Sequence, residues 1–71
     1  MKKQIKITTE FITLGQLLKL VDVIDNGGAA KFYLAENEVL VNDEPDTRRG
    51  RKLRPGDRVL LPGEKLEIEI R

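Results

Sequence analysis

The sequence contains no histidine, cysteine or serine. Their absence removes the commonest general acids and bases, the commonest nucleophiles and the usual zinc ligands. We therefore expect no catalytic residues, no metal site and no cofactor. Without cysteine there are no disulfides, which is typical of a reducing compartment, and we expect the protein to be cytoplasmic.

Long apolar runs are absent as well. No window approaches the roughly 20 apolar residues of a membrane span, and the start MKKQIKITTE lacks the apolar stretch of a signal peptide. A chain of 71 residues has room for one domain, which we place at residues 1–71, and its core must be small. We expect a monomer that does not enter a membrane.

The formal net charge of +1 conceals an uneven distribution of charge. Acidic residues are spread along the chain, whereas residues 47–58 carry six basic residues and one acid, a net charge of +5. The rest of the chain has a net charge of −4. We call residues 47–54, TRRGRKLR, the basic loop. Its cations are Arg48, Arg49, Arg51, Lys52 and Arg54.

The basic loop is a candidate phosphate-binding site. The planar fork of arginine suits phosphate oxygens, and cations placed against nucleic acid release condensed counterions. The alternative is a solvated loop whose charge keeps a small protein soluble. Gly50 permits a sharp turn and Leu53 can anchor the segment to the core, so we expect the loop to be held in place.

Hydrophobic patterning predicts strands at both ends of the chain. Residues 2–8 and 65–71 alternate apolar and polar side chains with period two. We expect these two strands to pair antiparallel, with Lys6 on the same face as Glu67 or Glu69. Further strands are predicted at 38–42 and 58–62, the first with its two valines on one face, and NDEPD, RPGD and PGE are predicted turns.

Two helices are predicted between the terminal strands. The segment LGQLLKLVDVI has apolar residues at the i, i+3, i+4, i+7 spacing of an amphipathic helix, and Thr13 with Gln16 matches a capping box. Asn26 is suited to cap a second helix through AAKFYLAE, and Asn37 suits a left-handed exit. A short break separates the two segments, so they are predicted to form a helical hairpin.

The sequence NGGAAK at the start of the second helix is another candidate anion site. Backbone N–H groups at a helix N-terminus can receive phosphate, and glycines permit close approach. Lys19 and Lys31, both predicted to be exposed, would reinforce it. The segment lacks the Gly-Lys-Ser/Thr ending of a P-loop, so it gives no support to nucleotide hydrolysis. A plain turn between helices is the alternative.

The order of these elements resembles the S-four-type RNA-binding domain, first named for ribosomal small-subunit protein four. The resemblance runs over residues 13–60 and is clearest in LGQLLK, NGGAAKFYLAENEVLVN and TRRGRKLRPGDRV. Within that family the sequence looks most like the small stand-alone proteins of the YaaA/YbcJ type, in which flanking strands complete the domain. The resemblance implies an α+β fold of the alpha-L type. A helical hairpin would pack on a small, curved, mostly antiparallel sheet whose N- and C-terminal strands pair.

The resemblance also implies that structured RNA, ribosomal or transfer RNA, docks on the hairpin and the adjoining basic loop. Many family members carry arginine where this chain has Thr13 and Gly27. In this chain the basic loop would therefore supply more of the cationic contacts with RNA phosphate. RNA shape would be read more than sequence. The residues expected to contact RNA are Lys19, Asn26, Gly27, Gly28, Lys31, Asn42, Arg48, Arg49, Arg51, Lys52 and Arg54.

The leading hypothesis is therefore a non-enzymatic RNA-binding protein that acts on the ribosome or its assembly intermediates. The alternative from another class is a protein–protein interaction module that sets the basic loop against an acidic partner. A sulfur-carrier-like hypothesis fails, because such carriers resemble one another in a terminal Gly-Gly and this chain ends Ile70-Arg71.

Overall fold

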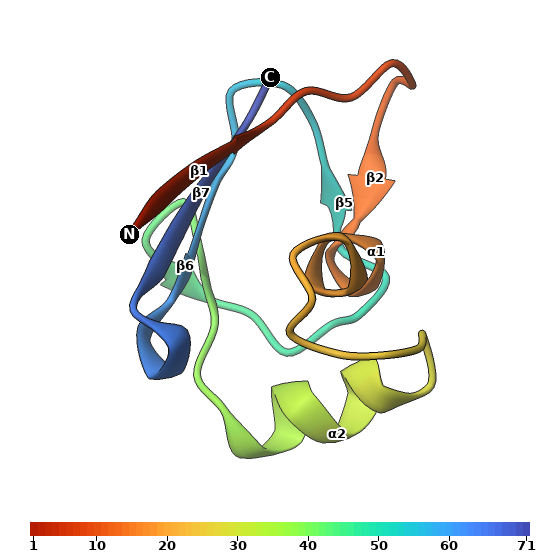
Figure 1. Cartoon of the computed structure of the whole chain (residues 1–71), viewed down its shortest axis with the longest axis vertical. Coiled ribbons are helices and arrows are strands. Elements are labelled where there is room, and N and C mark those ends of the chain that lie inside the picture. The colour runs from red at the N-terminus through yellow and green to blue at the C-terminus, as the bar shows by residue number, and fades with distance from the viewer.

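The computed structural model describes all 71 residues as an α+β fold (Figure 1). Five strands form one sheet in the order β1-β7-β6-β3-β4, and β2 pairs with β5 in a second, two-stranded sheet. Neither α-helix has the length and hydrophobicity to span a membrane. The elements are β1 (Lys2–Ile5), β2 (Ile12–Thr13), α1 (Leu14–Leu20), α2 (Ala29–Glu36), β3 (Leu40–Val41), β4 (Glu44–Pro45), β5 (Lys52–Leu53), β6 (Arg58–Leu61), the 3-10 helix η1 (Pro62–Glu64) and β7 (Leu66–Ile70).

The helix α1 begins at the predicted capping box. The backbone N–H of Gln16 donates to the hydroxyl of Thr13 over 3.2 Å, and the side chain of Gln16 accepts from the N–H of Thr13 over 2.8 Å. The helix ends at Leu20, earlier than its apolar pattern predicts. Asp22 adopts a left-handed conformation with φ of 61°, which stops the helix and turns the chain toward α2.

The helix α2 begins at the predicted residue, but both of its caps differ from the prediction. The predicted cap at Asn26 is displaced, because the N-cap position is Gly28 and has no side-chain cap. Asn26 lies two residues earlier, where its side-chain oxygen accepts from the N–H of Ala29 over 3.1 Å. The predicted left-handed exit at Asn37 is wrong, because its φ is −128°. Both the backbone N–H and the side-chain amide of Asn37 donate to the carbonyl of Tyr33. These bonds close the helix while the extended chain continues directly toward β3.

The terminal strands pair with each other, but in parallel rather than in the predicted antiparallel orientation. The register aligns Lys2 with Glu67, and the two side chains form an ion pair at 3.6 Å. The opposite-charge pair expected for Lys6 is therefore made by Lys2. Alternating polarity is the same in either strand direction, so the pattern alone carried no information on orientation. The other strand pairs are antiparallel, and the sheet is mostly antiparallel as expected.

Backbone hydrogen bonds extend the parallel pairing beyond β1 and β7. The N–H of Glu67 donates to the carbonyl of Met1, and the N–H of Arg71 donates to the carbonyl of Ile5. The N–H of Ile7 in turn donates to the carbonyl of Arg71 over 2.8 Å. The two ends of the chain are thus joined along their whole length.

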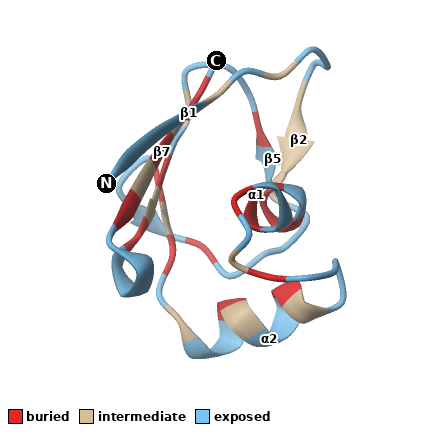
Figure 2. Ribbon diagram, viewed as in Figure 1, coloured by how far each residue is buried: buried red, intermediate tan, exposed pale blue.

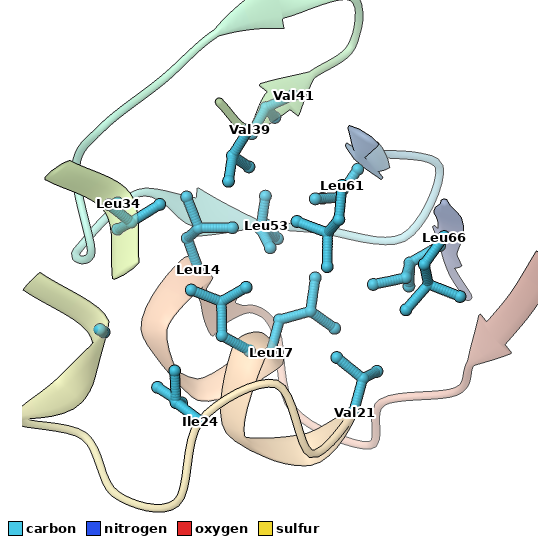
Figure 3. Packing of buried hydrophobic residues seen from close by; sticks show 14 of the residues in the cluster. Leu14, Leu17, Val21, Ile24, Leu34, Val39, Val41, Leu53, Leu61 and Leu66 are labelled. Atoms are coloured by element: carbon cyan, nitrogen blue, oxygen red, sulfur yellow. The ribbon is translucent and has the colours of Figure 1, made fainter. Parts of the chain in front are cut away.

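The core lies between the large sheet and the helical hairpin. In Figure 2 the ribbon is coloured red at buried residues, which occur in both helices and in the strands of the sheet. Figure 3 shows Leu14 and Leu17 of α1 pointing toward Leu53 of β5 and Leu61 of β6. Leu53 is fully buried, as expected for the anchor of the basic loop. A core of 15 buried apolar residues is small, so each of them matters to stability.

We expect Leu53→Ala to lower the free energy of unfolding by about 2 to 5 kcal/mol, because it leaves a cavity in this core. The matched control is Leu20→Ala. That leucine is 59% exposed on α1, and its loss should change stability by no more than about 0.5 kcal/mol. Denaturant unfolding of the two variants gives both values. Equal, small losses would show that Leu53 does not anchor the loop.

Candidate nucleic-acid interface

The basic loop lies across the start of α1. The N–H of Leu14 donates to the carbonyl of Arg51 over 2.8 Å, and the N–H of Gly15 donates to the carbonyl of Arg49 over 2.9 Å. The first N–H groups of a helix have no partner within it, and here the loop supplies two. The expectation that the loop is held in place is confirmed. The same bonds remove the start of α1 as an anion site.

Gly15 allows the close approach between the loop and α1. A Cβ at this position would lie 3.3 Å from the carbonyl oxygen of Arg49 and 3.5 Å from the Cβ of Ala30. A side chain would therefore press on both the basic loop and α2. Glycine within a helix costs roughly 1 kcal/mol relative to alanine, and these two contacts explain why α1 contains one.

The carboxylate of Asp46 is the buried partner of two arginines in the basic loop. Its Oδ1 accepts from the backbone N–H of Arg48 (2.9 Å) and from its Nε (3.1 Å). Its Oδ2 accepts from Nη2 of Arg48 (2.9 Å) and Nη1 of Arg51 (3.1 Å). The side-chain hydrogen bonds from Arg48 are the main cause that lowers the pKa of Asp46 to about 2, although burial opposes the shift. One carboxylate thus fixes the first half of the loop.

The other three cations of the loop have no acidic partner. Arg49, Lys52 and Arg54 are exposed, and none of them lies within ion-pair distance of a carboxylate. The charge of Arg48 and Arg51 is partly offset by Asp46, whereas these three charges are not. The strongest positive potential of the loop therefore comes from Arg49, Lys52 and Arg54.

Four of the five cations of the loop line an open hollow of about 560 Å³, which we call the arginine hollow. No hydrophobic residue lines it, unlike the mostly apolar sites that bind drug-sized molecules. Its lining residues are Arg48, Gly50, Arg51, Lys52, Arg54 and Asp57. A hollow with this lining suits an anion that reaches it from solvent.

A second hollow of about 390 Å³, which we call the helix hollow, shares Gly50 with the first. It brings Lys19 of α1 and Gly27 of the interhelical turn together with Arg49 of the basic loop. A Cβ at Gly27 would meet nothing within 4 Å, so the backbone there is open to a ligand. The two hollows adjoin across the turn at Gly50, and together they form one polar surface.

The expected contact Asn42 lines neither hollow, and its side chain is already hydrogen-bonded. Its Nδ2 donates to Oδ1 of Asp57 over 3.0 Å, and its Oδ1 accepts from the N–H of Arg58 over 2.9 Å. Oδ2 of Asp57 accepts from the N–H of Arg54 over 2.8 Å. Asn42 therefore holds the turn that follows the basic loop.

Three other expected contacts surround the start of α2 without lining either hollow. Asn26 accepts from the N–H of Ala29, Gly28 occupies the N-cap position, and Lys31 projects into solvent from the first turn. Of these three, Lys31 is the one with a cationic side chain, and no carboxylate lies within ion-pair distance of it.

One side chain at this surface was not predicted from the sequence. The ring of Phe11 lies beside the arginine hollow, with Nζ of Lys52 4.9 Å and Cζ of Arg54 5.7 Å from its centroid. The pairing of β2 with β5 places these residues together, and each of those strands has only two residues. A pairing this short gives no periodic signal that could have revealed the contact.

Comparison with known proteins gives two matches. A family model described as S4 domain matches residues 5–69. A curated protein from Bacillus subtilis (strain 168), "Probable ribosome maturation protein RlbA", is 65% identical over 63 residues, which cover 89% of each chain. The similarity to this relative therefore spans almost all of both sequences.

The low pKa of Asp46 predicts a component of stability that depends on pH. Its ordinary value is 3.8 and its folded value about 2, so the contribution is complete above about pH 4 and disappears as the pH falls toward 2. The size should be about 2 kcal/mol. Asp46→Asn cannot titrate and serves as the reference.

Denaturant unfolding of both proteins between pH 2 and pH 7 measures this component. The stability difference between wild type and Asp46→Asn should be largest at neutral pH and should shrink below pH 4. A difference that stays constant over this range would mean that the ion pairs of Asp46 do not stabilise the fold.

Proposed function

This chain belongs to the S4 domain family, and from that premise we propose that it is a non-enzymatic protein that binds structured RNA. The RNA backbone would dock on the two adjoining hollows, with the basic loop as the main cationic grip. The observation that carries the proposal is the set of three exposed cations, Arg49, Lys52 and Arg54, without acidic partners in a loop fixed against α1. Fixed, uncompensated cations favour a polyanion over water.

The geometry divides the expected contacts into two groups. Arg49, Lys52, Arg54 and Lys19 would contact phosphate, and Gly27 would let the backbone of the RNA come near. Asn42 would act indirectly, because it holds the turn after the loop. Asp46, which was not an expected contact, would also act indirectly by holding the loop. Such contacts read the position and shape of the RNA backbone rather than its base sequence.

Ribosomal RNA is the RNA class that we propose, with a role in ribosome assembly or function. The support is the printed description of the 65% identical relative as a probable ribosome maturation protein. Transfer RNA is the other folded RNA that the hollows would accommodate. On this proposal the protein acts as a monomer in the cytoplasm, where ribosomes are built and used.

The direct test removes the three unpaired cations and keeps Arg48 and Arg51, which hold Asp46. The variant is Arg49→Gln/Lys52→Gln/Arg54→Gln. The control, Lys3→Gln/Lys6→Gln/Lys65→Gln, loses the same charge from exposed positions elsewhere. Because it removes phosphate contacts, the first variant should bind a labelled hairpin RNA with an internal loop at least about tenfold more weakly.

Fluorescence anisotropy at several salt concentrations measures this effect. If the wild type engages about four to six phosphates, log K should fall against log salt with a slope of roughly −3 to −5. The loop variant should have a slope shallower by about 2 to 3, and the control should resemble the wild type. A flat salt response of the wild type, or equal losses in the two variants, would contradict the proposal.

Crosslinking in cells, followed by sequencing of the attached RNA, identifies the RNA. We expect enrichment of one region of ribosomal RNA that is lost in the loop variant and retained in the control. Enrichment of transfer RNA instead would correct the RNA class. Protein partners that survive nuclease treatment, without any enriched RNA, would favour an interaction module that binds an acidic protein.

A further inference from the structure

Two long cations of the arginine hollow are held without a carboxylate. Arg48 and Arg51 are fixed by Asp46, but Lys52 and Arg54 have no ion-pair partner. Free lysine and arginine side chains sample many rotamers, and ordering them on a ligand weakens binding. If Lys52 and Arg54 are to be ordered before phosphate binds, some other group must orient their side chains.

Phe11 is placed to do this. The cationic groups of Lys52 and Arg54 lie 4.9 Å and 5.7 Å from the centroid of its ring, within the range of cation–π attraction. The ring is half-buried, and its backbone carbonyl accepts from the hydroxyl of Thr9 over 2.9 Å. The next residue, Ile12, pairs with Leu53, the fully buried anchor of the basic loop.

An aromatic ring differs from a carboxylate in one respect that matters for an anion site. A carboxylate such as that of Asp46 orients arginines but offsets their charge. The face of an aromatic ring attracts a cation through its quadrupole and leaves the full positive charge in place. The N–H groups at the edge of a guanidinium stacked on a ring stay available to donate to phosphate.

We infer that Phe11 is a positioning residue for the RNA site: its ring orients Lys52 and Arg54 at the wall of the arginine hollow and preserves their charge. This inference rests on the proposed function. The ring affects RNA affinity only by orienting Lys52 and Arg54, so its effect disappears when these two cations are removed. A ring that stacked directly on a base would act independently of them.

The test is a double-mutant cycle with Phe11→Leu, which keeps an apolar side chain of similar reach and removes the ring. Binding of the labelled hairpin RNA is measured for the wild type, Phe11→Leu, Lys52→Gln/Arg54→Gln, and the combination. Phe11→Leu alone should weaken binding about five- to twentyfold, the loss expected when two side chains must be ordered on binding. In the background without the cations it should change affinity by less than about twofold.

Two further variants separate positioning from folding. Phe11→Tyr keeps the ring and should bind RNA like the wild type. Phe11→Met is a second ring deletion, used if Phe11→Leu lowers the thermal unfolding temperature. In the free protein, the ring should shift the side-chain methylene protons of Lys52 and Arg54 upfield in the NMR spectrum, and this shift should vanish in the ring deletions.

Each outcome of these experiments supports or overturns the positioning role of Phe11. Wild-type affinity in Phe11→Leu, or a loss that persists without the two cations, overturns the positioning role. If the wild type and the three-cation loop variant bind RNA equally, the proposed function fails. The NMR shifts still test, without RNA, whether the ring orients the two side chains, and absence of the shifts in the wild type also overturns the inference.

Discussion

The position of the basic loop on the helical hairpin depends on two backbone hydrogen bonds, from Leu14 and Gly15 at the start of α1 to carbonyls of the loop. A helix of seven residues begins with N–H groups that need partners, and a loop rich in arginine would otherwise be pushed outward by its own charge. The hydrogen bonds between the loop and the helix meet both needs. The loop completes the helix, and the helix gives the loop a fixed backbone.

The five cations of the basic loop have three kinds of side-chain surroundings. Asp46 fixes Arg48 and Arg51 and offsets part of their charge, whereas the ring of Phe11 lies against Lys52 and Arg54 and offsets none. The side chain of Arg49 has neither kind of partner, although its carbonyl receives the N–H of Gly15. The loop therefore combines rigidity near Asp46 with full charge near Phe11 and Arg49.

Local patterns in the sequence predicted both helices and the longer strands, but not the two-residue strands β2, β4 and β5, of which β4 lies inside the predicted turn NDEPD. They also did not predict how distant elements pair. The capping box of Thr13 and Gln16 is a short-range feature, and the structure contains it. The cap predicted at Asn26 lies at Gly28, although Asn26 still bonds to the first residue of α2. The parallel orientation of β1 and β7 could not be predicted, because period two is identical in both directions. The exit at Asn37 was misjudged because its side chain bonds back to the helix.

For the candidate site, too, the sequence predicted local features but not contacts between distant segments. Charge clustering identified the basic loop, and Leu53 was correctly expected to anchor it. The contact of Phe11 with Lys52 and Arg54 arises from a short pairing between distant segments, and an aromatic residue before a two-residue strand carries no local sign of such partners. The bonds of Asp46 to Arg48 and Arg51 are local, but nothing in the charge pattern distinguished this carboxylate from the other acids of its turn.

The parallel pairing of β1 with β7 also has a consequence for synthesis. During translation β1 emerges before every other element and β7 after all of them, yet each is the other's neighbour in the sheet. The hairpin of α1 and α2 can form early from local contacts, whereas β1 stays unpaired until β7 has been synthesised. Contacts between such distant residues are slow to form, so β1 can join the sheet only after β7 has been synthesised.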